Sequence, residues 1–160
     1  MTACISSLRR YAHALLRDRT AADDLVQDTL DRAWTRLTSW HDGADMRPWL
    51  FSIMHNLHVD QVRRPRLATV PVDEEAMTVA VRGMHHDNLE LRDLDAALQR
   101  LPAEQREVLL LVALEEMSYA EAADVLGISP GNVASRLCRA REKLRAVLDE
   151  QKTISLKVVR

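Results

Sequence analysis

The segment from residue 130 to residue 148 carries side chains that can bind nucleic acid. Asn132 and Arg139 offer groups that form paired hydrogen bonds with base edges, and Arg136 and Arg141 carry the positive charge that phosphates attract. Five basic residues and one acid give the segment a local charge of +4, on a chain whose net charge is −2. The segment is therefore a candidate DNA-contacting helix, with an ordinary solvated helix as the alternative on charge alone.

The residues that precede and begin this segment have the pattern of a helix-turn-helix. Ser118 and Glu121 have the spacing of a capping box, which begins a helix. Gly127 tolerates the left-handed conformation that ends one. Ser129 followed by Pro130 suits the N-cap and first turn of the next helix. The sequence therefore predicts two short-linked helices, of which the second enters the major groove.

Three apolar residues fit the packing of such a pair of helices. Ala123 is small enough for a close crossing, Val133 can fill the angle between the helices, and Ile128 gives the turn a core contact. A helical hairpin without a role in DNA binding is the alternative. The residues expected to face DNA are Asn132, Ala134, Ser135, Arg136, Cys138 and Arg139.

Two blocks of helical periodicity make up the rest of the chain. In the first block, apolar stripes begin at Leu8, Ala22 and Trp49, with Thr20 or a nearby aspartate as a cap and Pro48 in a first helical turn. The second block begins near Leu89 and is interrupted by a proline at position 102. These patterns predict an all-α protein.

The segment from Pro65 to about Asn88 lacks helical periodicity, because prolines interrupt it and β-branched residues are scattered through it. We interpret it as a flexible linker, with a short pair of strands as the alternative. The predicted fold is thus two small helical bundles joined by a flexible linker, the second bundle containing the helix-turn-helix. The predicted boundaries are 1–64 and 90–148 for the bundles, 65–89 for the linker and 149–160 for a C-terminal tail.

The composition argues against several other classes of protein. The two cysteines, Cys4 and Cys138, are far apart and show no metal-ligand spacing. His55 and His58 are three residues apart and His85 is followed by another histidine, but no set of cysteines or carboxylates accompanies them. No nucleophile elbow, phosphate loop, signal peptide or membrane span is recognisable. We therefore expect a cytoplasmic protein without catalytic residues, metal or cofactor.

Both blocks resemble the two conserved domains of the extracytoplasmic-function sigma factors of bacterial RNA polymerase, within the sigma-70 superfamily. The resemblance covers about Leu8 to Leu148, in the order of the family and with its linker between. The motifs that carry it in the first block are Leu15–Asp18, Ala22–Leu30, Ala33-Trp34, Trp49-Leu50, Ile53, Asn56, Asp60 and Arg63-Arg64. In the second block they are Leu101–Val108, Ser118–Ala123, Gly127–Ser129, Ser135–Leu137 and Arg139–Glu142.

The resemblance implies promoter-specific transcription initiation in complex with core polymerase. It assigns docking on the clamp helices of the largest polymerase subunit to Asp24, Leu25, Gln27 and Asp28. It assigns capture of the −10 promoter element to Arg32, Arg36, Trp40, Asn56, Arg63 and Arg64. The −35 element falls to the second helix of the helix-turn-helix, although Ala134 and Cys138 depart from the usual residues there. An anti-sigma factor is a further implied partner, and a small-molecule substrate is not.

Alternatives remain at several of these positions. The acidic residues around Asp24 form either a docking face or a solvated surface, and Trp40 either stacks on DNA or packs its loop. Trp34 and Trp49 are expected in the core rather than at a stacking platform. For the whole chain, the alternatives are a stand-alone helix-turn-helix regulator, whose first block would serve for dimerisation or ligand sensing, and a protein-only adaptor.

Overall fold

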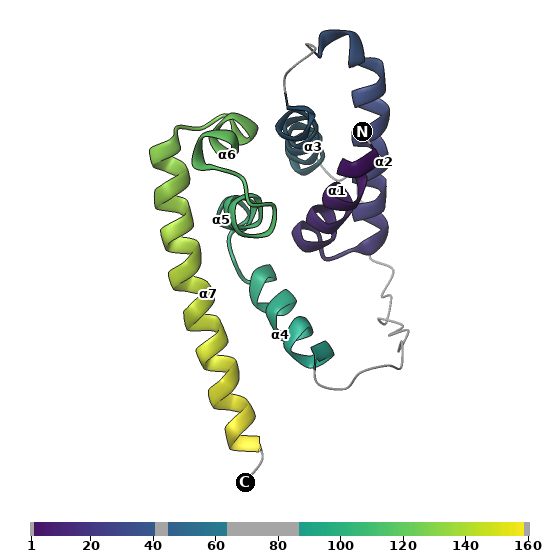
Figure 1. Cartoon of the computed structure of the whole chain (residues 1–160). Coiled ribbons are helices and arrows are strands. Elements are labelled where there is room, and N and C mark those ends of the chain that lie inside the picture. The colour runs from purple at the N-terminus through teal and green to yellow at the C-terminus, as the bar shows by residue number, and fades with distance from the viewer. Residues whose placement is uncertain (1, 41–44, 64–86, 159–160) are drawn as a thin grey trace.

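The computed structural model describes residues 2–40, 45–63 and 87–158, and these residues form helices without any strand (Figure 1). The first three helices, which we call the N-terminal bundle, are α1 (Thr2–Leu15), α2 (Arg19–Thr35) and α3 (Met46–Arg63), with a short 3-10 turn η1 (Leu37–Ser39) after α2. The C-terminal bundle consists of α4 (Asp87–Gln99), α5 (Ala103–Leu109), the π-helical turn η2 (Leu110–Leu114), α6 (Tyr119–Leu126) and α7 (Pro130–Val158). The predicted all-α class and the two helical blocks are confirmed.

The N-terminal bundle is built on the predicted apolar stripes. Leu8, Tyr11 and Leu15 of α1 are buried, and the ring of Tyr11 meets that of Phe51 on α3 edge-on at 5.2 Å between centroids. Burial raises the pKa of the Tyr11 hydroxyl well above its usual value. Asp18, rather than Thr20, caps α2, because its carboxylate accepts a hydrogen bond of 2.9 Å from the Thr20 amide.

One tryptophan prediction for this bundle is wrong. Trp34 is 72% exposed, although it was expected in the core. The buried stripe of α2 runs from Ala22 through Val26 to Ala33, and the next residue, Trp34, points about 100° around the helix from that stripe. Trp49, in contrast, packs against the core as expected.

The C-terminal bundle begins and ends at different residues from those predicted. Helix α4 starts at Asp87, within the stretch assigned to the linker, and α7 continues to Val158 without a break at residue 148. No glycine or proline follows Leu148, so nothing in the sequence stops that helix. Residues 64–86, which hold the rest of the predicted linker and its strand alternative, lie outside the described residues.

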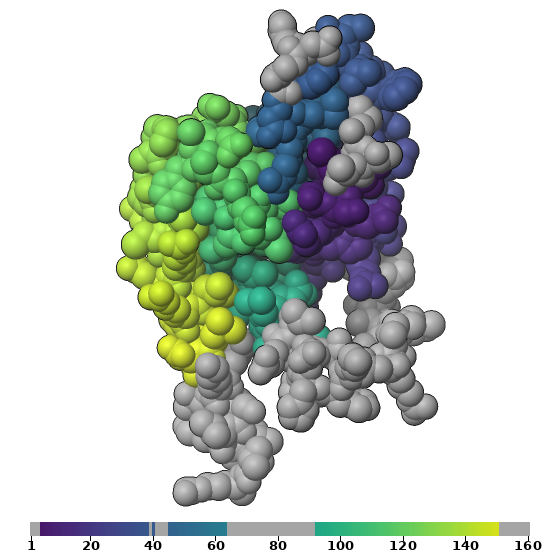
Figure 2. All heavy atoms as spheres, viewed as in Figure 1, coloured from purple at the N-terminus to yellow at the C-terminus, as the bar shows by residue number. Residues whose placement is uncertain are grey.

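The two bundles lie side by side and share one apolar core (Figure 1, Figure 2). Helix α3 packs against α6, and α1 packs against η2 and α4. The long helix α7 covers α4, α5 and α6 on the side away from the N-terminal bundle (Figure 1). Among the described helices, none is both long and apolar enough to cross a membrane.

Candidate polymerase-binding and nucleic-acid-binding surfaces

The acidic side of α2 is exposed along much of its length. Asp24, Gln27 and Asp28 all reach solvent. Gln61 on α3 donates a long hydrogen bond of 3.5 Å to the Asp28 carboxylate, and Gln27 donates one of 3.4 Å to Asp31. These contacts are weak, so the carboxylates remain available to a positively charged partner.

Leu25 does not belong to this surface. Its side chain is completely buried in the core of the N-terminal bundle, and its carbonyl accepts a 2.7 Å hydrogen bond from the buried Thr29 hydroxyl. The assignment of Leu25 as a polymerase contact is therefore corrected, because the residue lies on the stripe of α2 that packs inward. It supports its acidic neighbours by fixing the helix in place.

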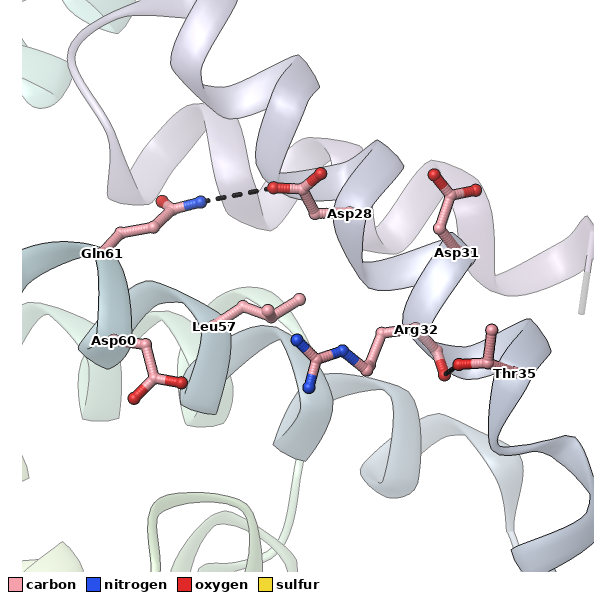
Figure 3. Close-up of a pocket in the computed structure, with 7 residues that line it drawn as sticks. All are labelled: Asp28, Asp31, Arg32, Thr35, Leu57, Asp60 and Gln61. Atoms are coloured by element: carbon pink, nitrogen blue, oxygen red, sulfur yellow. Dashed lines mark hydrogen bonds between the residues drawn. The ribbon is translucent and has the colours of Figure 1, made fainter.

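A cleft of about 380 Å³ separates this side of α2 from α3 (Figure 3). Figure 3 shows the guanidinium of Arg32 extending from α2 toward α3 beside Leu57, with Asp28 nearer the start of α2. Three carboxylates and one guanidinium give the cleft a negative balance. Its lining residues are Asp28, Asp31, Arg32, Thr35, Leu57, Asp60 and Gln61.

A second, adjoining cleft brings together three of the residues predicted to bind the −10 element. Arg32, Arg36 and Asn56 line this cleft of about 250 Å³ between α2 and α3. They come from positions up to 24 residues apart (56 − 32), and helix packing alone places them together. The carboxylate of Asp60 also lines the cleft. The two guanidinium groups and the amide beside it offer hydrogen-bond donors to phosphates and to base edges.

Of the remaining residues predicted at the −10 site, Trp40 and Arg63 are described and do not line this cleft. Trp40 is half-buried, and its indole Nε1 is buried without a hydrogen-bond partner among the described residues. Arg63 is exposed at the end of α3. Arg64 lies outside the described residues, as does most of the loop after Trp40.

The helix-turn-helix has the geometry that the sequence predicts. Ser118 and Glu121 form a complete capping box at the start of α6. Gly127 has a φ of 63°, and a Cβ added there would have no neighbour within 4 Å, so only its backbone conformation requires glycine. Ser129 accepts a 3.2 Å hydrogen bond from the Asn132 amide and thus caps α7. Ala123 and Val133 are buried between the helices.

The capping box also alters the acidity of Glu121. The Ser118 hydroxyl and the Ser118 amide donate hydrogen bonds of 2.6 and 2.8 Å to the same carboxylate oxygen. These bonds favour the ionised form and lower the pKa of Glu121 from its usual value. The negative charge is thereby held at the N-terminus of α6, where the helix dipole also stabilises it.

The N-terminal half of α7 exposes most of the residues predicted to read the −35 element. Asn132, Ala134, Ser135, Cys138 and Arg139 all reach solvent on this helix. The Ser135 hydroxyl is used within the helix, where it donates a 2.9 Å hydrogen bond to the Gly131 carbonyl. Arg136, in contrast, is only half-exposed. Its guanidinium forms an ion pair of 3.0 Å with the carboxylate of Glu104 on α5.

Sequence reasoning missed the charged contacts between the bundles. Glu115, which follows η2, is completely buried although it is charged. Arg10 of α1 and Arg47 of α3 both approach its carboxylate at 2.9 Å. No local pattern signals this cluster, because its members are far apart in the chain and their partners are visible only in three dimensions.

The histidine pair of α3 also faces the C-terminal bundle. His55 and His58 lie 3.3 and 3.6 Å from the buried carboxylate of Glu107. Burial lowers the pKa of His58, an effect that the negative charge of Glu107 opposes. Neither these three side chains nor any other group of three among the described residues is arranged to hold a metal ion. His85 and His86 lie outside the described residues.

Two families of known protein domains match this chain. The family described as Sigma-70, region 4 matches residues 91–144, which include the helix-turn-helix. The Sigma2 domain of PhyR matches residues 1–55, which include the acidic face of α2. The class is therefore that of sigma factors of the sigma-70 type.

Full-length relatives narrow the class. The sigma factor EcfG of Rhodopseudomonas palustris is 39% identical over 91% of this chain and 81% of its own length. The sigma factor SigM of Bacillus subtilis is 31% identical over 89% of each chain. This chain belongs to the extracytoplasmic-function family of RNA polymerase sigma factors.

Solved structures show the same similarity in three dimensions. The sigma factor RpoE of Bartonella quintana, in complex with the anti-sigma factor NepR, is 34% identical with a TM-score of 0.78, covering 92% of this chain and 93% of its own. The sigma factor CnrH, in complex with the cytosolic domain of CnrY, is 33% identical with a TM-score of 0.70, covering 93% and 84%.

Proposed function

We propose that this sigma factor divides its work between three surfaces: the acidic face of α2 for core polymerase, the cleft of Arg32 and Asn56 for the −10 element, and α7 for the −35 element. The observation that carries this proposal is the convergence of Arg32, Arg36 and Asn56 in one cleft beside an exposed acidic helix face. A protein that only binds duplex DNA needs neither feature.

The acidic face supports docking on the clamp helices of the largest polymerase subunit. Asp24 and Asp28 stand one turn apart on the exposed side of α2. Two carboxylates at that spacing attract a basic surface from a distance and fix the position of the helix along it. Gln27, between them, adds a neutral donor and acceptor.

The cleft between α2 and α3 supports capture of a single DNA strand. Arg32 and Arg36 offer positive charge along one wall, and Asn56 offers an amide that can bond a base edge on the other. A base removed from the duplex stack costs a few kcal/mol, which contacts of this kind offset. Arg63 and Arg64 extend the positive charge at the end of α3 in this proposal, and Trp40 bounds the loop.

The exposed half of α7 supports recognition of the −35 element in the major groove. Asn132 and Arg139 can form paired bonds with bases, while Ser135 and Arg136 stand beside phosphates. Ala134 and Cys138 present short side chains at the same surface. We therefore expect promoter choice to depend on fewer polar base contacts than the six positions would allow.

A regulatory partner follows from the relatives. RpoE of Bartonella quintana and CnrH have both been solved in complexes, the first with the anti-sigma factor NepR and the second with the cytosolic domain of CnrY. We propose that this chain also binds an anti-sigma factor, that it works in the cytoplasm, and that it acts by binding alone, without catalytic residues, cofactor or small-molecule substrate. As functional domains we propose 1–64 and 90–148, with 65–89 as a linker and 149–160 as a tail, while helices α4 and α7 themselves extend past residues 90 and 148.

The decisive experiment is run-off transcription with purified core polymerase and candidate promoter fragments. We expect a transcript that requires this chain, core enzyme and both promoter elements. A stand-alone regulator would bind the same fragments without core enzyme and produce no transcript on any template. That outcome would overturn the proposal in favour of the regulator, and an adaptor would give neither DNA binding nor transcript.

A further inference from the structure

Several polar contacts between described residues join the two bundles: Arg10 and Arg47 with Glu115, Gln99 and Arg106 with carbonyls of α1, and His55 and His58 with Glu107. The cluster around Glu115 has the most hydrogen bonds. Arg10 donates two hydrogen bonds, of 3.1 Å from Nε and 2.9 Å from Nη2, to one oxygen of the Glu115 carboxylate. Arg47 donates to the other oxygen at 2.9 Å and also to the Glu115 carbonyl. Both arginines belong to the N-terminal bundle, whereas Glu115 belongs to the C-terminal bundle. Among the described residues, the carboxylate is therefore held by side chains of the other bundle alone.

The backbone around Glu115 is shaped to present it. Helix α5 widens into the π turn η2, whose last hydrogen bond runs 3.0 Å from the Glu115 amide to the Leu110 carbonyl. The next residue, Glu116, has a φ of 54°, a conformation that side chains other than glycine rarely adopt. Strained and π-helical backbone of this kind is typical of functional positions.

Two of the other polar contacts between the bundles are made to backbone carbonyls. Gln99 and Arg106 donate to the Ala14 and Leu15 carbonyls at the end of α1, at 3.2 and 2.8 Å. These carbonyls lack partners within their own helix, and water can replace the two side chains. An interface joined by such groups resembles those between proteins that associate reversibly.

The closed arrangement brings the two proposed DNA-binding surfaces to one place. Asn56 and Arg63, proposed for the −10 element, line the same groove of about 460 Å³ as Arg136, proposed for the −35 element. The centres of these elements are separated by about 25 base pairs, or roughly 85 Å at 3.4 Å per pair. Residues that line one small groove cannot contact both promoter elements at the same time. The closed form is therefore incompatible with a promoter bound at both elements.

We propose that Glu115 is an intramolecular latch that keeps the free chain closed, and that its release from Arg10 and Arg47 opens the chain for promoter binding. The effect on promoter binding rests on the proposed function, whereas the closing of the two bundles by Glu115 does not depend on it. In the closed form the carboxylate has no contact with water and depends on both arginines. In the open form water solvates it, while the arginines, already partly exposed, lose little.

The latch is tested on the isolated chain by small-angle X-ray scattering. We expect the unaltered chain to be compact, and Glu115→Gln to raise the ratio of open to closed chains about tenfold or more, because a neutral amide cannot replace two charge-assisted bonds. The matched control is Glu150→Gln, which removes an exposed pair with Arg100, 3.2 Å, inside the C-terminal bundle. The control should scatter like the unaltered chain.

A second pair of variants guards against misfolding of the first. Arg10→Gln and Arg47→Gln remove the same bonds from partly exposed positions in the other bundle, and both should also open the chain while helix content by circular dichroism stays unchanged. An extended unaltered chain, or Arg variants as compact as it, would overturn the latch. Scattering requires no polymerase, so failure of run-off transcription would refute the proposed function and leave this result standing.

Discussion

The guanidinium of Arg136, on the helix proposed to read DNA, lies 3.0 Å from the carboxylate of Glu104 on α5. In this contact the carboxylate of Glu104 binds the guanidinium that is expected to bind a DNA phosphate. Glu104 is 71% exposed, so the pair is weak enough for a phosphate to replace the carboxylate. The bond nevertheless competes with DNA.

Replacement of Glu104 by Gln should therefore strengthen DNA binding. Loss of the competing charge is expected to raise the affinity of the chain for a −35 fragment about two- to fivefold, the range of an exposed ion pair. Fluorescence anisotropy with a labelled duplex at fixed salt measures it. Glu150→Gln, at a pair far from the helix-turn-helix, is the control, and an unchanged or lower affinity for Glu104→Gln would contradict the prediction.

Reversal of charge at Asp28 should abolish binding to core polymerase. Asp28→Lys places a positive group against the proposed basic partner and is expected to lower the affinity at least about thirtyfold. The residue is exposed and loses only the 3.5 Å bond from Gln61, so helix content should not change. Co-purification with core enzyme measures the effect. Asp124→Lys, at an exposed position of α6, should bind normally. Equal binding of both variants would refute the docking role.

Arg139 should contribute to the choice of promoter. Arg139→Ala is expected to weaken binding at the −35 element by about 1–3 kcal/mol if the side chain bonds a base, with loss of preference at one base pair. Arg139→Lys keeps the charge but not the paired geometry, so it should restore phosphate binding and not the preference. Binding to a set of single-base variants of the element distinguishes the two. Uniform weakening across that set would assign Arg139 to phosphate instead.

The capping box of α6 should give a pH-dependent contribution to stability. Ser118→Ala is expected to lower the free energy of unfolding by about 1 kcal/mol at pH 7. The folded pKa of Glu121 lies below its usual value of 4.5, so the carboxylate stabilises the fold above that value and loses this effect as pH falls through the folded pKa. The difference in the free energy of unfolding between the unaltered chain and Ser118→Ala should therefore become smaller at acidic pH.

Urea unfolding at several pH values measures this difference. Ser135→Ala is the control, because the Ser135 hydroxyl bonds only to the Gly131 carbonyl of its own helix and should contribute little at any pH. A Ser118→Ala difference that stays constant from pH 7 to a pH below the folded pKa of Glu121 would show that the hydroxyl acts without the carboxylate.

The left-handed backbone at Glu116 should make glycine the better residue there. Glu116→Gly is expected to raise the free energy of unfolding by about 0.5–1 kcal/mol, since relief of the steric cost exceeds the added flexibility of glycine. Gly127→Ala makes the opposite change at a φ of 63° with no neighbouring atoms in the way, and should lower stability by about 1–2 kcal/mol. A loss of stability for Glu116→Gly in urea would contradict this account.

Local signals in the sequence were sufficient where the structure is local. The capping box of Ser118, the turn at Gly127 and the burial of Val133 depend on residues within a few positions of each other, and all three were predicted. The placement of Leu25 on the contact surface was predicted wrongly. Its place among acidic neighbours suggested a contact surface, but the helical stripe that it shares with Ala22 and Thr29 directs it inward.

The contacts between the bundles could not be predicted in this way. Glu115 follows an apolar run, and nothing nearby indicates that a charged residue there is buried. Its partners Arg10 and Arg47 are 105 and 68 positions away, so the pairing depends on how two separate helical blocks come together. The half-buried state of Arg136 has the same origin, because Glu104 belongs to a different helix.

The length of α7 has a mechanical consequence. Its 29 residues span roughly 43 Å at 1.5 Å per residue, with the proposed base-reading residues confined to one end and no proline to bend the remainder. A protein that binds the C-terminal end of α7 therefore binds one end of a rigid helix whose other end carries these residues. A small rotation applied there would swing Asn132 and Arg139 out of register with the major groove, without any contact with the DNA or with the residues that bind it.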